Sequence, residues 1–229
     1  MKPAINELEE KGNAAKAASR KLAFLSTEIK NKALVNIAES IIDKQDEILA
    51  ANKIDYDTAK ASGMNEAMLD RLMLSPSRLE GIAQDTKTVA TLPDPVGEVF
   101  ETRTLPNGLQ ISKRRVPLGV IGAIYESRPN VTIDISSLCL KSGNAVILRG
   151  GKEAINSNTA LARVAQEICH RAGVPDGVFE VVTVDRELTG EVGDEMCTNP
   201  IVKKISFTGS TDVGKLLMKL SSDTVKRMR

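Results

Sequence analysis

The spacing of hydrophobic residues changes near residue 116, and this change divides the chain into two sections. Before it, apolar residues recur at helical spacing on one face among charged neighbours, as at Leu34, Ile37, Ile41 and Ile48. After it, short continuous apolar runs such as 119–125 and 145–148 alternate with helical segments. Such runs are typical of strands that are buried on both faces. We therefore predict helices before residue 92 and an α/β arrangement after residue 116.

Start signals place several helices within residues 1–92. The alanine-rich stretch 14–25 predicts one helix. Further helix starts are marked by good N-caps and by a first-turn proline, at Ser26, Ser75 and Pro76. The stretch 52–63 is polar, and we interpret it as turn-like around a short helix. We assign no chemistry to this section and expect its helices to pack on the α/β part.

A β-hairpin is expected over residues 93–115. Prolines at the start of this segment break the preceding helix, and the runs 96–104 and 109–115 are strand-like. Between them stands Asn107-Gly108, a strong hairpin-turn signal. The ribbon has two interpretations. It is either a sheet edge or an oligomer contact in which another subunit satisfies the exposed backbone groups.

The predicted elements of residues 116–229 alternate regularly between strands and helices. The strand-like runs are 119–125, 145–148, 178–182 and 202–207, and the helical runs are 132–141, 157–172, 186–197 and 215–220. This alternation predicts a doubly wound, Rossmann-like parallel sheet with helices on both faces. In such sheets, ligands bind at the carboxyl ends of the strands.

Composition narrows the classes of function. Of 229 residues, 31 are Lys or Arg and 30 are Asp or Glu, so the net charge is close to zero. This charge balance gives no reason to expect binding to nucleic acid or to a membrane surface. No apolar run approaches the roughly 18 residues of a membrane-spanning helix, and no signal-peptide core is found. Three cysteines without metal-like spacing suit a reducing compartment, so we expect a cytoplasmic protein without a metal. A single histidine, His170, argues against a His-based triad.

The three cysteines lack the surroundings of a catalytic thiolate, which must be partly exposed and near positive charge. Cys139 falls within a predicted core helix, and Cys169 ends an amphipathic one. Cys197 lies ahead of the last predicted strand. We interpret all three as structural, so the sequence predicts no catalytic nucleophile within the chain.

The junction at 202–214 has the form of an anion-binding device. A strand ends at Thr208, Gly209 allows close backbone approach, and Ser210 or Thr211 can cap the helix that follows. The N–H groups of the first helical turn and the positive end of the helix dipole would then face a bound phosphate. A plain capped turn has the same spacing, so spacing alone leaves both interpretations open.

The residues of this junction are more specific than its spacing. The run 207–211, followed by Val213 and Gly214, resembles the coenzyme loop of the aldehyde dehydrogenase superfamily, whose motif is Gly-x-Thr-x-x-Gly. The resemblance implies an aldehyde-dehydrogenase-like coenzyme-binding domain. It also implies that the coenzyme is bound by Thr208, Gly209, Ser210 and Thr211.

The same resemblance assigns a coenzyme role to the turn after the second strand, which reads Arg149-Gly150-Gly151-Lys152. Many members of the superfamily place a Lys there and, three residues on, a Glu that binds the adenosine-ribose hydroxyls. Lys152 stands in place of that carboxylate, and a cation favours the 2′-phosphate of NADP(H) over NAD(H). The alternative is a solvated basic turn.

Two branches of the superfamily are represented along the chain. Residues 10–155 resemble the glutamate-5-semialdehyde dehydrogenases, also called γ-glutamyl phosphate reductases, through stretches such as 114–132 and 137–153. Residues 156–229 resemble succinate-semialdehyde-type dehydrogenases, through 172–179 and the coenzyme loop. The chain therefore reads as a mosaic, which is a natural hybrid, an engineered fusion or a divergent member.

The first resemblance implies NADPH-dependent reduction of L-glutamyl 5-phosphate to glutamate 5-semialdehyde, a step of proline biosynthesis, in a homo-oligomer (a dimer or a tetramer). Arg128 and Asn130 are then candidates for contacting the small-molecule substrate, with a purely structural loop as the alternative. The alternative functions are an NAD(P)-dependent succinate-semialdehyde-type dehydrogenase and a non-catalytic coenzyme-binding or oligomerising module. Family members are longer, and we expect their nucleophilic cysteine beyond the equivalent of Arg229, so the chain alone should be inactive.

Overall fold

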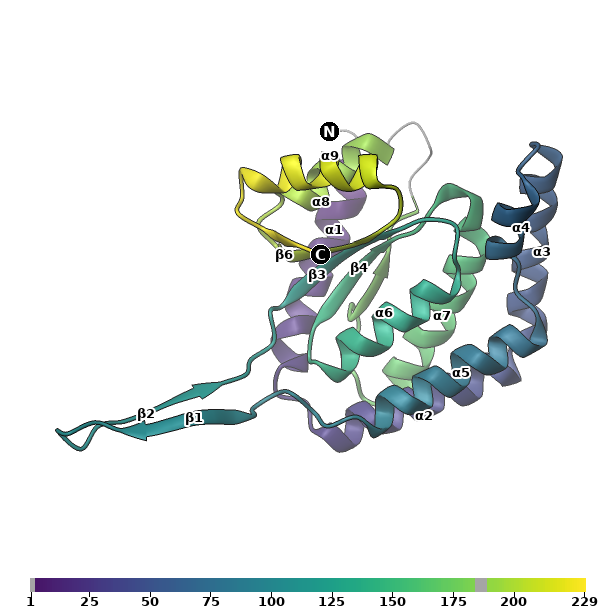
Figure 1. Cartoon of the computed structure of the whole chain (residues 1–229). Coiled ribbons are helices and arrows are strands. Elements are labelled where there is room, and N and C mark those ends of the chain that lie inside the picture. The colour runs from purple at the N-terminus through teal and green to yellow at the C-terminus, as the bar shows by residue number, and fades with distance from the viewer. Residues whose placement is uncertain (1–2, 184–188) are drawn as a thin grey trace.

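The computed structural model describes residues 3–183 and 189–229, and a parallel sheet lies at its centre (Figure 1). The strand order is β5-β4-β3-β6-β7, and every neighbouring pair is parallel. The strands are β3 (Val120–Tyr125), β4 (Ala145–Arg149), β5 (Phe179–Val181), β6 (Val202–Thr208) and β7 (Arg227–Met228). The predicted parallel sheet is confirmed. The pattern does not predict β7, because two residues carry no periodic signal.

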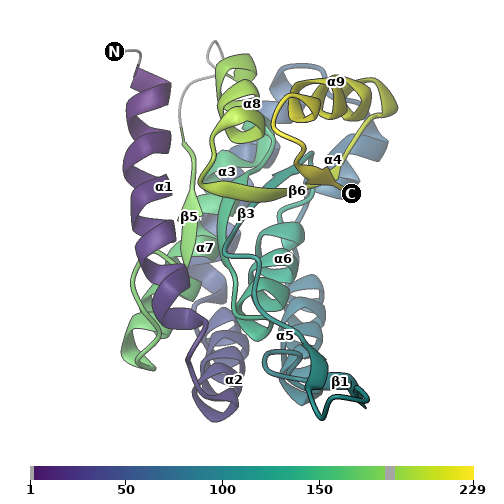
Figure 2. The same cartoon turned by 90° about the vertical axis from the view of Figure 1, so that its left-hand side faces the viewer.

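Helices cover both faces of the sheet, and one face carries two helical layers (Figure 2). On that face α6 (Asn130–Lys141) and α7 (Ile155–Arg171) are covered from outside by α2 (Thr27–Asp43), α3 (Gln45–Ala61) and α5 (Pro76–Thr91). The opposite face carries α1 (Pro3–Leu22), α8 (Thr189–Thr198) and α9 (Thr211–Ser222). The short helix α4 (Glu66–Leu72) and the 3-10 turn η1 (Lys152–Ala154) contact α3. Over the described ranges, no helix has the length and apolarity needed to cross a membrane.

Local sequence signals set the starts of the helices. The hydroxyl oxygens of Ser26 and Ser75 each accept a first-turn backbone N–H at 3.3 Å, so both predicted N-caps are confirmed. The predicted apolar face is buried, although its last member belongs to α3: Leu34, Ile37, Ile41 and Ile48. The helix predicted at 186–197 is found from Thr189, and residues 184–188 lie outside the described residues.

The interpretation of residues 52–63 as turn-like is wrong. The helix α3 continues unbroken to Ala61, and its polar residues Asn52 and Asp55 are buried. The carboxylate of Asp55 accepts the backbone N–H groups of Asn156 at 3.2 Å and Ser157 at 2.7 Å, in the first turn of α7. Asp55 therefore caps a different helix, and the spacing of residues along α3 cannot reveal this contact.

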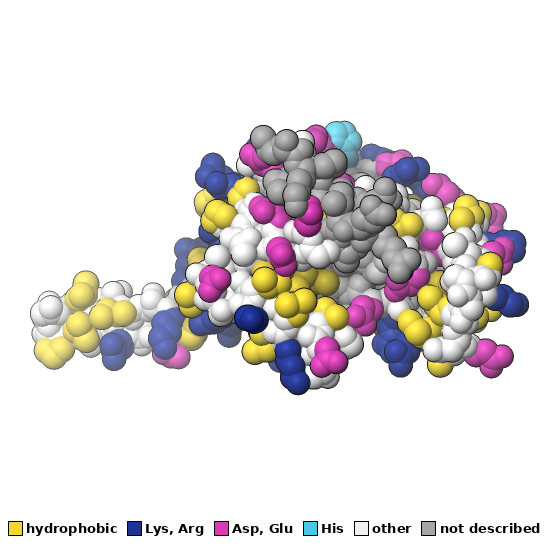
Figure 3. Space-filling model, turned by 90° about the horizontal axis from the view of Figure 1, so that it is seen from above, with side chains coloured by type: hydrophobic (Ala, Val, Ile, Leu, Met, Phe, Trp, Pro, Cys, Tyr) yellow, Lys and Arg dark blue, Asp and Glu magenta, His cyan; other side chains and the backbone are white. Residues whose placement is uncertain are grey.

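The hairpin of β1 (Val99–Thr104) and β2 (Gln110–Arg114) projects from the body of the molecule (Figure 1). It is a separate two-stranded antiparallel sheet, so the interpretation as an edge of the main sheet is wrong. The turn contains Gly108 at φ 83°, as the Asn-Gly signal predicts. Figure 3 shows hydrophobic side chains along this ribbon, and the exposed ones include Val99, Leu109 and Ile111.

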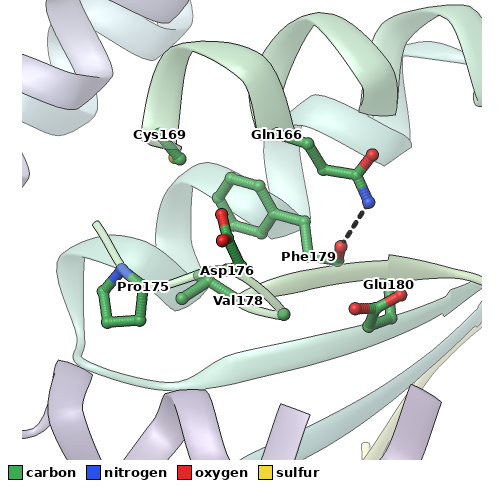
Figure 4. Close-up of a pocket in the computed structure, with 8 residues that line it drawn as sticks. Gln166, Cys169, Pro175, Asp176, Val178, Phe179 and Glu180 are labelled. Atoms are coloured by element: carbon green, nitrogen blue, oxygen red, sulfur yellow. Dashed lines mark hydrogen bonds between the residues drawn. The ribbon is translucent and has the colours of Figure 1, made fainter. Parts of the chain in front are cut away.

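Side chains of neighbouring helices cover the outer edge of β5. Gln166 Nε2 of α7 donates to the carbonyl oxygen of Phe179 at 2.6 Å (Figure 4), and Lys11 of α1 donates to that of Val181. Because these carbonyls are occupied, the edge is protected against the addition of another strand. The cavity drawn in Figure 4, of about 210 Å³, lies before the amino end of β5, opposite the end where α/β sheets bind ligands.

Candidate active-site region at the switch point

The carboxyl ends of β3 and β6 form the topological switch point of the sheet. From β3 the chain continues through α6 to β4 on one side, whereas β6 lies on the other side and follows α8. The two strands are paired to their ends, where Tyr125 lies opposite Thr208. The loops that follow them therefore open side by side, at the position where doubly wound sheets bind their ligands.

The predicted coenzyme loop lies at this switch point. Ser210 is the N-cap of α9, and its Oγ accepts the N–H of Val213 at 3.5 Å. A Cβ on Gly209 would stand 2.7 Å from Glu126 Cδ, so this position accepts no side chain unless a neighbour moves. All four predicted coenzyme residues of the loop are exposed: Thr208, Gly209, Ser210 and Thr211. The N-terminus of α9 is thus open to an anion from solvent.

Two neighbouring cavities share lining residues near the switch point, and one of them is lined by the predicted coenzyme loop. The first, of about 390 Å³, is lined by residues of α4, of the loop between β3 and α6, and of the coenzyme loop: Met68, Arg71, Glu126, Ser127, Arg128, Val131, Thr208, Gly209 and Ser210. The second, of about 340 Å³, shares Arg71 and Arg128 with the first and continues along α5. We call them the loop cavity and the α5 cavity.

The loop between β3 and α6 is held in an unusual backbone conformation. Ser127 has φ 52°, a left-handed value that costs a residue with a side chain about 1 kcal/mol or more. The carboxylate of Glu153 in η1 accepts both the N–H of Ser127 at 2.8 Å and its hydroxyl at 2.9 Å. These bonds stabilise the backbone conformation immediately before Arg128, a residue that lines both cavities. The sequence pattern gives no sign of this role for Glu153.

The structure separates the two predicted coenzyme cations. Lys152 is exposed at the start of η1, whereas Arg149 is buried, and its Nη1 donates to the carbonyl oxygen of Val182 at 3.3 Å. Burial lowers the pKa of Arg149, and the carboxylates of Glu7 and Glu153 partly oppose this effect. Only Lys152 therefore presents its charge to solvent.

The two glycines between these cations are required by packing. A Cβ on Gly150 would stand 2.9 Å from the ring of Tyr125 and would overlap the amide of Asn158. A Cβ on Gly151 would overlap the carboxylate of Glu153. Gly150 is also buried, so its observed role is the close approach of this turn to η1 and α7.

The two predicted substrate residues differ in what they face. Arg128 is exposed and lines both cavities. Asn130 begins α6, donates from Nδ2 to Asp134 Oδ2 at 2.8 Å, and lines only the α5 cavity. The structure adds Arg71 of α4, which lines both cavities and which sequence reasoning missed. A lone arginine in a short amphipathic helix gives no signal of a site.

All three cysteines are buried. Burial raises the pKa of the Cys139 and Cys169 thiols to about 12 each. Burial also raises the pKa of Cys197. None of them lines the loop cavity. Within residues 3–183 and 189–229, no group of three or more His, Cys, Asp and Glu residues is placed to hold a metal ion.

Comparison with known proteins finds reductases and a dehydrogenase among the proteins that this chain is similar to. A γ-glutamyl phosphate reductase of Dehalococcoides mccartyi (strain CBDB1) is 57% identical over 193 residues, which are 84% of this chain and 46% of the relative. The crystal structure of γ-glutamyl phosphate reductase from Thermotoga maritima matches with a TM-score of 0.90 and 36% identity, over 97% of this chain and 52% of that one. A succinate-semialdehyde dehydrogenase from Burkholderia pseudomallei matches with a TM-score of 0.70 and 27% identity, over 97% and 42%.

Both branches that the sequence resembles are therefore found among its relatives. The chain spans about half the length of the curated relatives it matches. The model of the aldehyde dehydrogenase family matches residues 5–229, almost the whole chain. Together with the doubly wound sheet, this match shows that the chain belongs to the aldehyde dehydrogenase family.

Proposed function

We propose that this chain is the coenzyme-binding part of an NADPH-dependent reductase that converts L-glutamyl 5-phosphate to glutamate 5-semialdehyde, a step of proline biosynthesis. The observation that carries the proposal is the predicted coenzyme loop at the switch point, where Gly209 accepts a side chain only if Glu126 or Phe207 moves and the N-terminus of α9 is exposed. The similarity to γ-glutamyl phosphate reductases supports the choice of substrate.

In the proposed reaction, a cysteine thiolate attacks the acyl carbon of the substrate, and inorganic phosphate leaves with the electrons of the broken C–O bond. NADPH, when bound, would supply the hydride that reduces the resulting thioester. The C–S bond then breaks, which releases the aldehyde and regenerates the cysteine thiolate. The described cysteines do not suit the attack, because each is buried and has a raised pKa. We therefore assign the thiolate to the part of the enzyme that the matched relatives have in addition to the region aligned with this chain.

We propose that Lys152 gives a preference for NADP(H) over NAD(H). Its ammonium group is exposed beside the end of β4. The guanidinium group of Arg149 is buried, so it contributes positive potential at this turn without reaching the solvent. A charge-assisted contact with a 2′-phosphate is worth about 1.5–3 kcal/mol, or roughly 10- to 150-fold in affinity. Lys152→Glu should therefore remove or reverse the preference.

The test is a titration of the purified chain with NADPH and with NADH, followed by coenzyme fluorescence. Lys87→Glu is the matched control, because Lys87 is exposed on α5 and lines neither cavity. The ratio of the two affinities should change in Lys152→Glu and stay constant in Lys87→Glu. An unchanged ratio in both variants would count against Lys152, and no binding of either coenzyme would overturn the coenzyme-binding proposal.

Two alternative functions each have an observation in their favour. The similarity to a succinate-semialdehyde dehydrogenase favours oxidation of a semialdehyde, and the buried cysteines favour a module without turnover. The assay is NADP⁺ reduction with glutamate 5-semialdehyde and phosphate, and separately with succinate semialdehyde. We expect no turnover by the isolated chain. Turnover that disappears in Cys197→Ser would overturn this expectation and assign the nucleophile to Cys197.

We also propose a division of labour along the chain. Residues 116–229 form the coenzyme-binding domain, residues 1–92 pack on it as helices, and the projecting ribbon within 93–115 is an oligomer contact in a dimer or tetramer. The exposed apolar side chains of the ribbon support the last assignment. The reducing surroundings that suit three free cysteines support a cytoplasmic location.

A further inference from the structure

Two arginines from distant parts of the sequence face the same two cavities. Arg71 lies near the end of α4, and Arg128 lies in the loop between β3 and α6; both line the loop cavity and the α5 cavity. Both are exposed, and among the described residues neither forms an ion pair. Arg78, a third arginine of the α5 cavity, is by contrast bound to the carboxylate of Asp70 at 2.7 Å.

The charges around these cavities leave a positive excess. In the loop cavity, the guanidinium groups of Arg71 and Arg128 face one carboxylate, that of Glu126. In the α5 cavity the carboxylates are Asp70, which already holds Arg78, and Asp85. The N-terminus of α9, capped by Ser210, adds further positive potential to the loop cavity. An anion therefore fits this space better than a cation does.

Both arginines are mounted on fixed backbone. The end of α4 is held by buried Asn52, whose Nδ2 donates to the carbonyl of Leu72 at 2.8 Å and whose Oδ1 accepts the N–H of Leu74 at 2.7 Å. Arg128 follows Ser127, which the carboxylate of Glu153 holds in its left-handed conformation. Such support reduces the conformational freedom that binding must remove.

We propose that Arg71 and Arg128 together bind one oxyanion group of the substrate, beside the coenzyme loop. This inference rests on the proposed function, whose acyl-phosphate substrate carries two such groups, a carboxylate and a phosphate. A planar guanidinium binds either group through two parallel hydrogen bonds. Arg71 thereby gives the helical section of residues 1–92 a part in substrate binding, where the sequence alone assigned it no chemistry.

The test is isothermal titration of the full 229-residue chain with two probes, inorganic phosphate and glutarate, which carries carboxylates but no phosphate. The variants are Arg71→Gln, Arg128→Gln, the double variant and Arg71→Lys, and the matched control is Arg163→Gln, an exposed arginine on α7 outside both cavities. Because both arginines are exposed, these substitutions should leave the fold intact, which circular dichroism checks.

We expect each single glutamine variant to weaken the binding of at least one probe about tenfold or more, with the control unchanged. The double variant should lose less than the sum of the two single losses, because both side chains hold one anion. Arg71→Lys should fall between wild type and Arg71→Gln. The probe that is affected identifies the group, phosphate or carboxylate, that the pair recognises.

Three results would overturn the inference: no binding of either probe by the wild-type chain, equal binding by wild type and all variants, or an effect on NADPH binding alone. The last result would assign the arginines to the coenzyme. Failure of the inference is distinguishable from failure of the proposed function, because NADPH binding by the wild-type chain is measured on the same samples. A chain that binds NADPH but no probe keeps the proposed function and loses only the arginine pair.

Discussion

Replacing Asp55 by alanine should destabilise the whole chain, because this carboxylate joins α3 to the first turn of α7. One oxygen accepts the N–H and the side-chain amide of Asn156 at 3.2 and 2.8 Å, and the other accepts the N–H and the hydroxyl of Ser157 at 2.7 and 2.6 Å. Asp55 and Ser157 are buried, so water cannot replace the lost acceptor freely. The helix α7 packs against the sheet, α2 and α3, so its first turn cannot fray without opening the core.

The expected loss combines two known effects. Removal of a capping side chain costs about 0.5–2 kcal/mol. Each buried donor left without an acceptor costs about 1–3 kcal/mol. We expect a total of about 3 kcal/mol for Asp55→Ala, which for a domain of this size lowers the melting temperature by roughly 6–12 °C. Asp55→Asn keeps one acceptor oxygen and should lose about half as much.

The assay is thermal and urea unfolding followed by circular dichroism. Asp57→Ala is the matched control on the same helix, because Asp57 is exposed and makes only an i,i+4 ion pair with Lys53. Its loss should stay below about 0.5 kcal/mol. If the melting temperatures of Asp55→Ala and Asp57→Ala agree within about 2 °C, the contact of Asp55 with α7 does not stabilise the chain by the expected amount.

Three further predictions concern other parts of the molecule. Burial raises the pKa of Asp94, but its bonds with Lys30, with the Thr27 hydroxyl and with the N–H of Val96 together outweigh burial and lower the pKa overall. The stability that wild type has over Asp94→Asn should therefore be complete near neutral pH and disappear as the pH falls below about 4 in urea titrations. Gly209→Ala should weaken NADPH binding, measured by coenzyme fluorescence, because the added methyl group meets the Glu126 carboxyl and the ring of Phe207. Glu126→Ala in the same chain removes the first contact and should restore part of the binding; no restoration would disprove that contact as the cause. Ile111→Lys on the hairpin should reduce self-association in sedimentation velocity, and a wild-type chain that is monomeric at all concentrations would contradict the oligomer contact.

Much of the fold is predictable because its signals act within one or two turns of chain. The run 145–148 of β4 is apolar and is buried throughout, as a central parallel strand must be. Ser26 and Ser75 cap helices through N–H groups three residues away, and Gly108 turns the hairpin by its own backbone freedom. The junction at 202–211 is predictable from sequence for the same reason, because its strand, glycine and N-cap are consecutive, while its coenzyme role stays a prediction.

Contacts between residues far apart in the sequence determine the rest of the candidate site, and these contacts cannot be predicted from the spacing of residues. Asp55 caps amides about a hundred positions further along the chain. Without knowledge of that contact, the polar residues around Asp55 have the sequence pattern of an exposed turn. Arg149 and Lys152 read as a pair of cations, yet the end of β4 directs one inward and leaves the other in solvent. Arg71 lines the same cavity as the predicted coenzyme loop, and the end of its helix α4 is held by Asn52. The burial and the partners of a polar side chain depend on which distant backbone groups the fold brings to it.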